Sequence, residues 1–459
     1  MLNKNLIENY IINNENKLKI NSNEIVNGDI FLALQGNNYH GNQFIESSIN
    51  NGAKFCLTDK KNHIPSNSEK IVFVENIFFF LSDLVKKKRK LFKGKVIGIT
   101  GSAGKTTLKE ALSFFLRKKY KVSSSNRSYN NFLGVILTIL NMNLKAKFAV
   151  FELGTNNFGE IKKIVQLALP SQVIITNIQS THLANFKNKR KIAIEKSDIF
   201  NPKYNPNIRS LIFLNINKEE NLLLNYAHKY QIKKIITIGQ TQNSNCYISE
   251  IKKKNNKYLV NLIINKKNYT LTTKTNILHR IRNIIFCLAL FNYNKLGVDI
   301  ILKNFNKFKP VVGRGLIYEK KINNKKIKFI DETYNANPDT MKQSIEYFHS
   351  MKTRGFDKIL ILGNMNELGK HSEKFHLEIL RFIEKFKFHC VILCSQFFQF
   401  AVSKIEKPSN KYIFKKNEND LIEYIKSDLH KNAMILAKCS NSTSVNKFGI
   451  KFINMKGND

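Results

Sequence analysis

The sequence lacks the cysteine pairs and long apolar segments that characterise zinc-binding, secreted and membrane-spanning proteins. It contains no tryptophan, 7 prolines, 20 glycines and six cysteines, and the cysteines are mostly isolated in apolar sequence. No CxxC pair is present, so we expect buried free thiols instead of a zinc site. No apolar run approaches the roughly 20 residues that a membrane-spanning helix needs, and the first 17 residues lack the apolar segment of a signal peptide. We therefore expect a cytoplasmic protein that does not insert into a membrane.

Acidic residues are scarce as well. The chain has 34 Asp and Glu against 75 Lys and Arg, which gives a formal net charge of +41. Such a charge suggests a nucleic-acid partner, but the lysines are spread along the chain and form no stripe with interleaved aromatics. Asn, Ile and Phe, which share A/T-rich codons with lysine, are also abundant, so we attribute the charge to mutational drift. We expect no specific nucleic-acid partner, and a basic nucleic-acid-binding P-loop protein is kept as an alternative of another class.

A chain of 459 residues is too long for one hydrophobic core. Residues up to about 90 are typical of a small mixed unit, with a turn and then a strand over 28–34, a short helix over 44–53 and a basic linker over 86–93. From 95 to about 309, strand-like runs alternate with helical stretches, a pattern that predicts a parallel sheet covered by helices.

A third unit begins near Gly313 and repeats this pattern, with buried strands predicted over 358–362 and 390–393. The sequence therefore predicts an α/β protein with three domains, which we place at residues 1–92, 93–310 and 311–459.

The strongest local signal is a glycine-rich loop over residues 98–107, which read GITGSAGKTT. It follows an apolar strand and opens a helix whose N-terminal amides can bind phosphate oxygens. Lys105 can neutralise the terminal phosphates and Thr106 can bind Mg²⁺. Ile99 stands where a strict GxxxxGK[ST] pattern has its first glycine. We predict that seven consecutive residues bind the nucleotide: Gly101, Ser102, Ala103, Gly104, Lys105, Thr106 and Thr107.

Two further polar residues follow the ends of predicted strands downstream of this loop. These are Glu152 and His182. Ligands of an open parallel sheet bind at the carboxyl ends of the strands, and Mg²⁺ prefers carboxylate oxygen while accepting an imidazole less often. Each residue alone also fits an ordinary polar strand end, but in series after the phosphate loop the pair indicates a metal site.

The loop in its shorter TGxxGKTT form resembles that of the Mur ligases and their folylpolyglutamate synthase relatives. Motifs similar to those of this family follow in order from about Ser22 to Lys438. The resemblance implies a small N-terminal α/β domain that holds a uridine nucleotide, a central P-loop-type domain with a mostly parallel sheet that binds ATP, and a C-terminal Rossmann-like ligase domain. It also implies ATP-dependent amide formation through an acyl phosphate, with two Mg²⁺ ions, and we expect a monomer.

The resemblance assigns roles to further residues. Lys196, within EKSDIF, would be carbamylated and would bind metal with Thr106, Glu152 and His182. Asn283, in HRIRN, would bind the nucleotide, although a polar helix start would look the same. Arg314, in GRG, would reach the ATP phosphates after domain closure. The residues expected to be catalytic are Lys105, His182, Lys196 and Arg314.

Two motifs of the last domain resemble the family members that add D-alanyl-D-alanine to UDP-N-acetylmuramoyl-tripeptide in peptidoglycan synthesis. They are DETYNANP over 331–338 and LGNMNELG over 362–369, and the D-N-P-R motif expected of the ligase that adds the third residue is missing. Asp331 would contact the nucleotide. The residues expected to bind substrate are Ser22, Asn131, Tyr334, Asn335 and Asn337.

Two of the chain's departures from the family pattern lie near its ends. The expected D-S-R is NSN over 21–23, and the expected K-G-S-R is KCSN over 438–441. These changes bear on substrate affinity more than on the type of reaction. They leave open a catalytically weakened binding protein, and another ligase of the superfamily, such as the tripeptide synthetase or a folylpolyglutamate synthase, is a further alternative.

Overall fold

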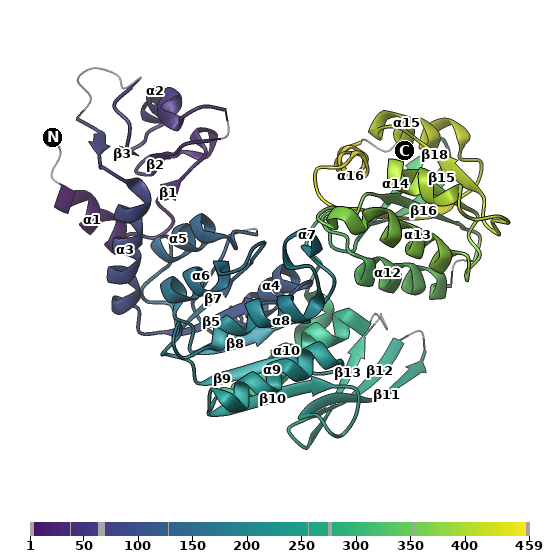
Figure 1. Cartoon of the computed structure of the whole chain (residues 1–459), viewed down its shortest axis with the longest axis horizontal. Coiled ribbons are helices and arrows are strands. Elements are labelled where there is room, and N and C mark those ends of the chain that lie inside the picture. Colours follow the sequence, from purple (N-terminus) through teal and green to yellow (C-terminus); the bar gives the residue numbers. More distant parts are fainter. Residues whose placement is uncertain are drawn as a thin grey trace.

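The computed structural model describes residues 4–36, 38–62, 69–126, 128–255, 257–273, 278–352 and 354–455. The described chain forms three units, with the N-terminal unit (purple) and the C-terminal unit (green to yellow) on either side of the central one (Figure 1). Each unit is built on one sheet, of four, nine and six strands. The predicted α/β class with mostly parallel sheets is confirmed, whereas the domain boundaries at 92/93 and 310/311 stay predictions.

The N-terminal unit is a four-stranded parallel sheet in the order β1-β2-β3-β4. All four residues of β2 and of β3 are buried, which is why short apolar runs suffice to form them. The elements are α1 (Lys4–Asn13), β1 (Leu18–Lys19), η1 (Ser22–Glu24), β2 (Ile30–Ala33), η2 (Gly41–Phe44), α2 (Ile45–Asn50), β3 (Phe55–Thr58), β4 (Ile71–Phe73) and α3 (Ile77–Leu91).

The prediction of a linker over 86–93 was wrong, because α3 continues to Leu91. The apolar face of this helix is buried, and Lys88 of the basic run is buried with it. Lys88 is 1% exposed, and its ammonium donates hydrogen bonds to the carbonyls of Ile11, Asn14 and Leu140. These carbonyls lie at the ends of α1 and α5, where the helix dipoles are negative. Lys88 therefore connects the N-terminal unit to the central one.

The central unit has the strand order β13-β12-β11-β10-β9-β8-β5-β7-β6, and β5 to β10 pair in parallel. Its strands are β5 (Lys95–Thr100), β6 (Val122–Ser124), β7 (Phe148–Glu152), β8 (Gln172–Ile175), β9 (Ser210–Leu214), β10 (Lys234–Gly239), β11 (Cys246–Lys254), β12 (Lys257–Ile264) and β13 (Lys267–Thr273). Its helices are α4 (Lys105–Leu116), α5 (Phe132–Leu140), α6 (Glu160–Ala168), α7 (Leu183–Phe186), α8 (Lys189–Ser197), η3 (Asp198–Phe200), α9 (Lys218–Lys229), α10 (Leu278–Tyr293), α11 (Asp299–Asn304) and η4 (Phe305–Lys307).

The predicted alternation of strands and helices does not extend over the whole central unit. The strands β11, β12 and β13 form an antiparallel ribbon at one edge of the sheet (Figure 1). A two-residue turn at Asn265 and Lys266 joins β12 to β13, so no crossover helix is needed there. The side chain of His279, in the HRIRN motif, lies outside the described residues.

The C-terminal unit has the strand order β14-β15-β19-β16-β17-β18, parallel except for the β14–β15 hairpin. The strands predicted over 358–362 and 390–393 are confirmed as β16 and β17. The elements are β14 (Leu316–Ile322), β15 (Lys325–Glu332), α12 (Pro338–Ser350), β16 (Asp357–Gly363), η5 (Gly369–His371), α13 (Ser372–Ile383), β17 (Cys390–Cys394), α14 (Gln396–Val402), β18 (Tyr412–Phe414), α15 (Glu418–Glu423), η6 (Tyr424–Asp428), β19 (Ala433–Lys438) and α16 (Ser444–Asn454).

The six cysteines are free and buried, as predicted. Among the residues that the structure describes, no helix has the length and apolar character needed to cross a bilayer.

Candidate active site

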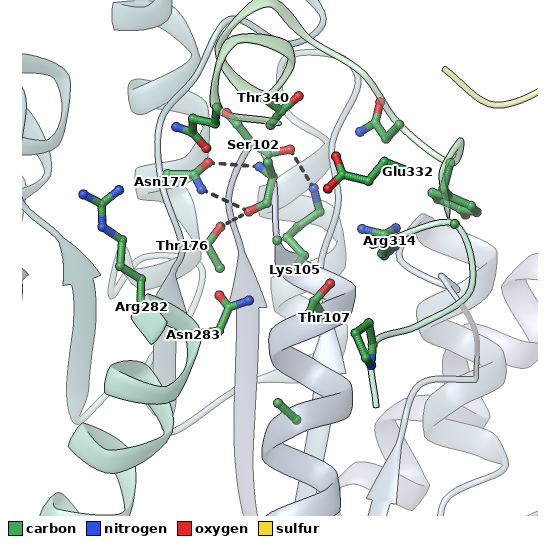
Figure 2. Close-up of a pocket in the computed structure, with 18 of the residues that line it drawn as sticks. Ser102, Lys105, Thr107, Thr176, Asn177, Arg282, Asn283, Arg314, Glu332 and Thr340 are labelled. Atoms are coloured by element: carbon green, nitrogen blue, oxygen red, sulfur yellow. Dashed lines mark hydrogen bonds between the residues drawn. The ribbon is translucent and has the colours of Figure 1, made fainter. Parts of the chain in front are cut away.

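A cleft of about 730 Å³ lies between the central and C-terminal units. The wall from the central unit includes the phosphate loop, the segments after β7 and β8, and the start of α10. Its other wall consists of the segments around β15 and α12 (Figure 2). The cleft thus lies at the carboxyl ends of parallel strands, where the sequence predicted a ligand site.

The phosphate loop has a backbone that requires glycine. Gly101 and Gly104 have φ values of +141° and +81°, and a Cβ on Gly101 would lie 1.9 Å from Thr176 Oγ1. Thr176 Oγ1 donates to the Ala103 carbonyl at 2.6 Å, and the Ala103 amide donates to Asn177 Oδ1 at 3.0 Å (Figure 2). This supporting role of Thr176 and Asn177 was not predicted, although two polar residues directly after β8 were a usable signal.

Lys105 begins α4 and turns its ammonium back over the loop. Its Nζ donates to the carbonyls of Gly101 at 2.8 Å and Ser102 at 3.4 Å. Burial lowers the pKa of Lys105, while Glu152 opposes this effect and Arg314 adds to it. A desolvated ammonium close to the loop suits a triphosphate, whose charge it can neutralise.

Glu152, the last residue of β7, holds the residues beside the phosphate loop. Its Oε2 accepts from Thr106 Oγ1 and its Oε1 accepts from Asn130 Nδ2, both at 2.7 Å. Glu152 and Asn130 line the cleft, whereas Thr106 is buried behind them. Asn131, predicted to bind substrate, caps α5 by accepting from the Gly134 amide at 2.8 Å and is not among the residues that line the cleft.

His182 lies in the cleft wall, but its Nδ1 is in direct contact with the carboxylate of Glu367 from the C-terminal unit. The Ala184 amide donates to the Glu367 carbonyl at 3.2 Å. The same loop is held again by Asp339, which accepts from the Ser180 amide at 3.0 Å and forms an ion pair with Lys189 at 3.2 Å. Glu367 and Asp339 of the C-terminal unit therefore both hold the segment that carries His182, the predicted metal ligand.

Lys196 lies on α8, behind the cleft wall, and is 1% exposed. Burial lowers its pKa well below the ordinary value, Lys105 lowers it further, and Glu195 partly opposes them. Within the described residues, no group of three or more His, Cys, Asp and Glu side chains is placed to hold a metal ion. The predicted ligands Glu152 and His182 therefore do not form such a cluster in this structure.

Arg314 follows a tight turn at Gly313 and lies in the cleft wall. Its guanidinium carbon is 4.4 Å from the centre of the Tyr334 ring, and the Tyr334 hydroxyl donates to Ser128 Oγ at 2.9 Å. Burial lowers the pKa of Arg314, and Glu152 and Tyr334 oppose this. Arg314 is thus fixed between a ring and the phosphate-loop side of the cleft.

Asp331 and Glu332 point in different directions at the end of β15. Asp331 is 1% exposed and accepts from the Gly313 amide at 2.7 Å and from Thr333 Oγ1 at 2.7 Å, and it does not line the cleft. Glu332 lines the cleft and accepts from Lys438 Nζ at 2.9 Å. Glu332 was not among the predicted site residues. Alternation of side chains along a strand implies that Asp331 and Glu332 face opposite ways, but it does not say which of them faces the cleft.

The other residues predicted to bind substrate do not all lie in the cleft. Asn335 and Tyr334 line the cleft. Asn337 caps α12 by accepting from the Thr340 amide at 2.9 Å. Ser22 lies in η1 of the N-terminal unit and is not part of the cleft lining.

Part of the cleft lining is apolar. Asn283, predicted to bind nucleotide, and Thr107 also line the cleft. Apolar lining residues that were not predicted include Ala111, Leu214, Phe305, Phe308 and Pro310. An apolar slot beside a phosphate loop and two polar side chains suits the base and sugar of a nucleotide.

Comparisons with known proteins agree with this geometry. Residues 16–91 match the Mur ligase family, catalytic domain; residues 99–291 match the Mur ligase middle domain; and residues 316–441 match the Mur ligase, glutamate ligase domain. The UDP-N-acetylmuramoyl-tripeptide–D-alanyl-D-alanine ligase of Rickettsia prowazekii is 30% identical over 434 residues, covering 95% of this chain and 94% of the relative.

Two solved structures share the whole fold. The crystal structure of MurF from Acinetobacter baumannii has a TM-score of 0.79 at 22% identity, covering 95% of this chain and 93% of that one. The MurF ligase of Thermotoga maritima, in complex with ADP, has a TM-score of 0.78 at 23% identity, covering 97% and 99%.

Proposed function

The chain belongs to the Mur ligase family, and we propose that it joins D-alanyl-D-alanine to UDP-N-acetylmuramoyl-tripeptide while ATP is converted to ADP and phosphate. The observation that carries the proposal is a single cleft in which Lys105 and Glu152 face Arg314, Glu332 and Tyr334 from another unit. The substrates are those in the name of the Rickettsia relative, and the DETYNANP and LGNMNELG motifs favour them over those of the tripeptide synthetase or a folylpolyglutamate synthase.

The reaction has two steps. A carboxylate oxygen of the tripeptide forms a bond to the γ-phosphorus of ATP, and the bond from that phosphorus to the β–γ bridging oxygen breaks, releasing ADP. The amine nitrogen of D-alanyl-D-alanine then attacks the acyl carbon, phosphate leaves and a proton is lost. A phosphate is a far better leaving group than an oxide, so the first step activates the carboxylate for amide formation.

Two cationic side chains of the protein would stabilise the transition state of the first step. Lys105 and Arg314 lie on facing walls of the cleft and would neutralise the charge that spreads over the transferred phosphoryl group. Tyr334 orients Arg314 by its ring contact. Glu332, and not Asp331, is the carboxylate at the cleft surface that could accept from substrate hydroxyls.

The donor set fits one magnesium ion. Glu152 and Thr106 offer a carboxylate and a hydroxyl 2.7 Å apart beside the phosphate loop, which are the hard oxygens that Mg²⁺ prefers. A bound ion would supply charge stabilisation at the phosphates and help orient them. A second ion, as the sequence analysis expects, would need His182 released from Glu367 and Lys196 converted to an anion.

Carbamylation of Lys196 is part of this proposal. The reaction needs a neutral amine, whose nitrogen adds to the carbon of CO₂ and loses a proton to give a carbamate. The strongly lowered pKa of buried Lys196 supports that state. Protein labelled with ¹³C-bicarbonate would give a carbamate carbon resonance that is absent from Lys196→Ala. Identical spectra for the two proteins would contradict carbamylation of Lys196.

We further propose that the N-terminal unit, including Ser22, holds the uridine nucleotide and that the domains meet near 92/93 and 310/311. The enzyme would act in the cytoplasm, consistent with six buried free thiols, and as a monomer, which light scattering on the purified protein would test.

The deciding assay measures ADP release from ATP, Mg²⁺, UDP-N-acetylmuramoyl-tripeptide and D-alanyl-D-alanine. Lys105→Ala should lower turnover by about 10²-fold or more. Lys163→Ala, an exposed lysine on α6, is the control and should leave turnover unchanged. Turnover with another amino acid in place of the dipeptide would favour a different ligase of the superfamily, and unchanged turnover in Lys105→Ala would contradict the nucleotide site.

A further inference from the structure

A second hollow, of about 1050 Å³, lies at the other end of the central sheet. Its lining includes Lys95, Gln172 and Lys234, the first residues of β5, β8 and β10. The phosphate loop follows the last residue of β5, so the two cavities lie at opposite ends of the same strand. The hollow shares no lining residue with the catalytic cleft.

The charged residues around this hollow are all basic, and no Asp or Glu lines it. Six of the cations are exposed, and within the described part of the chain none of the six forms an ion pair with a carboxylate. Like charges gathered around one space repel each other and raise the local concentration of anions. The six, named here as the cationic rim, are Lys93, Lys95, Arg209, Lys233, Lys234 and Lys295.

The floor of the hollow is a fixed polar network. Gln172 Nε2 donates to Asn294 Oδ1 at 2.8 Å and Asn294 Nδ2 donates back to Gln172 Oε1 at 2.9 Å. Lys95 Nζ also donates to Asn294 Oδ1, at 2.8 Å. This network holds at least one rim cation in place before any ligand arrives.

A seventh cation is fixed more firmly still. Arg89 Nε and Nη2 donate to the carbonyls of Ala168 at 2.8 Å and Leu169 at 2.9 Å, at the end of α6. Its guanidinium adds positive charge at a defined place in the wall. Preorganised cations lose little side-chain freedom when an anion binds, so they contribute more affinity than mobile surface lysines.

We propose that this hollow binds a small molecule that carries at least two phosphate groups. Seven cations from four separate segments exceed what one phosphate can contact, and phosphate oxygens match both ammonium and guanidinium donors. A volume of about 1050 Å³ is at the upper limit for small-molecule pockets, so the hollow has room for a nucleotide-sized ligand. The cations surround one hollow instead of forming the extended stripe that a nucleic-acid backbone would follow.

The test uses the full chain carrying Lys105→Ala, so that the phosphate loop contributes less to binding. Inorganic tripolyphosphate is titrated by calorimetry at physiological ionic strength into this protein and into two derivatives. One carries Lys95→Gln, Arg209→Gln and Lys295→Gln in the cationic rim. The other loses the same charge on β11 through Lys252→Gln, Lys253→Gln and Lys254→Gln.

The expected result is one-to-one binding that weakens at least about 30-fold in the rim variant and less than about twofold in the β11 variant. Thermal unfolding of each variant checks that it folds. If the first rim variant does not fold, the double variant Lys233→Gln and Lys234→Gln replaces it. Equal weakening in both derivatives would mean general attraction to a basic chain and would overturn the site. Rim-dependent binding of single-stranded DNA without binding of tripolyphosphate would also overturn it, in favour of nucleic acid.

Discussion

The hydroxyl of Tyr334 donates to Ser128 Oγ at 2.9 Å and so joins the two walls of the catalytic cleft. The ring of the same tyrosine lies 4.4 Å from the guanidinium carbon of Arg314. One side chain therefore couples the approach of the two units to the position of the cation that faces the phosphate loop.

Tyr334→Phe tests this coupling, because it keeps the ring and removes the hydroxyl. A hydrogen bond of this kind contributes about 1 kcal/mol, so kcat should fall about fivefold. Ser128→Ala should give the same loss, and the double variant should be no worse than either single one. Tyr269→Phe, on β13, is the matched control. Additive losses in the double variant would show that the two hydroxyls act separately.

Asp331 and Glu332 should separate stability from function. Asp331→Ala leaves the Gly313 amide and the Thr333 hydroxyl buried without their acceptor, so the free energy of unfolding should fall by about 2–4 kcal/mol. Glu332→Gln keeps an amide oxygen that can accept from Lys438 Nζ, so it should cost less stability than Asp331→Ala and should lower kcat/KM. Urea unfolding and steady-state kinetics measure the two effects, and a stable but inactive Asp331→Ala protein would support the predicted contact of Asp331 with the nucleotide instead.

The C-terminal unit should lose stability in acid through His376. This side chain is buried, accepts from the Met365 amide through Nε2 and contacts the Ser372 carbonyl through Nδ1, so the neutral ring satisfies both partners. Burial lowers the pKa of His376 from 6.5 to about 4.

Between these two pH values the unfolded chain binds more protons than the folded one, so stability falls as pH falls. One pH unit corresponds to about 1.4 kcal/mol per proton, and the loss should reach about 3 kcal/mol by pH 4. Denaturant unfolding at several pH values measures it against His376→Gln, whose amide oxygen can accept from Met365 but does not titrate. Parallel pH curves for the two proteins would exclude this histidine as the cause.

Removal of magnesium should stop ADP release, and added Mg²⁺ should restore it. Glu152→Gln keeps a partner for Thr106 and Asn130 but removes the negative charge beside the phosphate loop. Its apparent Mg²⁺ affinity should therefore fall at least about 10-fold. Glu250→Gln, on β11, removes the same charge far from the loop and should behave like the unmodified protein. A normal Mg²⁺ dependence in Glu152→Gln would exclude Glu152 as a ligand.

Local patterns predicted much of the fold and the phosphate loop, because a buried strand, a glycine-rich turn and a helix start are fixed by neighbouring residues. The ribbon of β11, β12 and β13 was missed because alternation of apolar runs does not distinguish hairpins from crossovers. Contacts between distant segments were also inaccessible. Nothing near His182 indicates Glu367, and nothing in the DETYNANP motif says which acidic residue faces the cleft until the register of β15 is known.

Lys88 has a consequence for how the molecule can move. Its one ammonium is shared by carbonyls of α1 and α5, and Asn141, just after α5, exchanges hydrogen bonds with the backbone of Leu18 at 2.8 and 3.0 Å. Pivoting the first unit away from the second would leave the buried Lys88 ammonium without its acceptors. We therefore expect the first two units to move as a single rigid body.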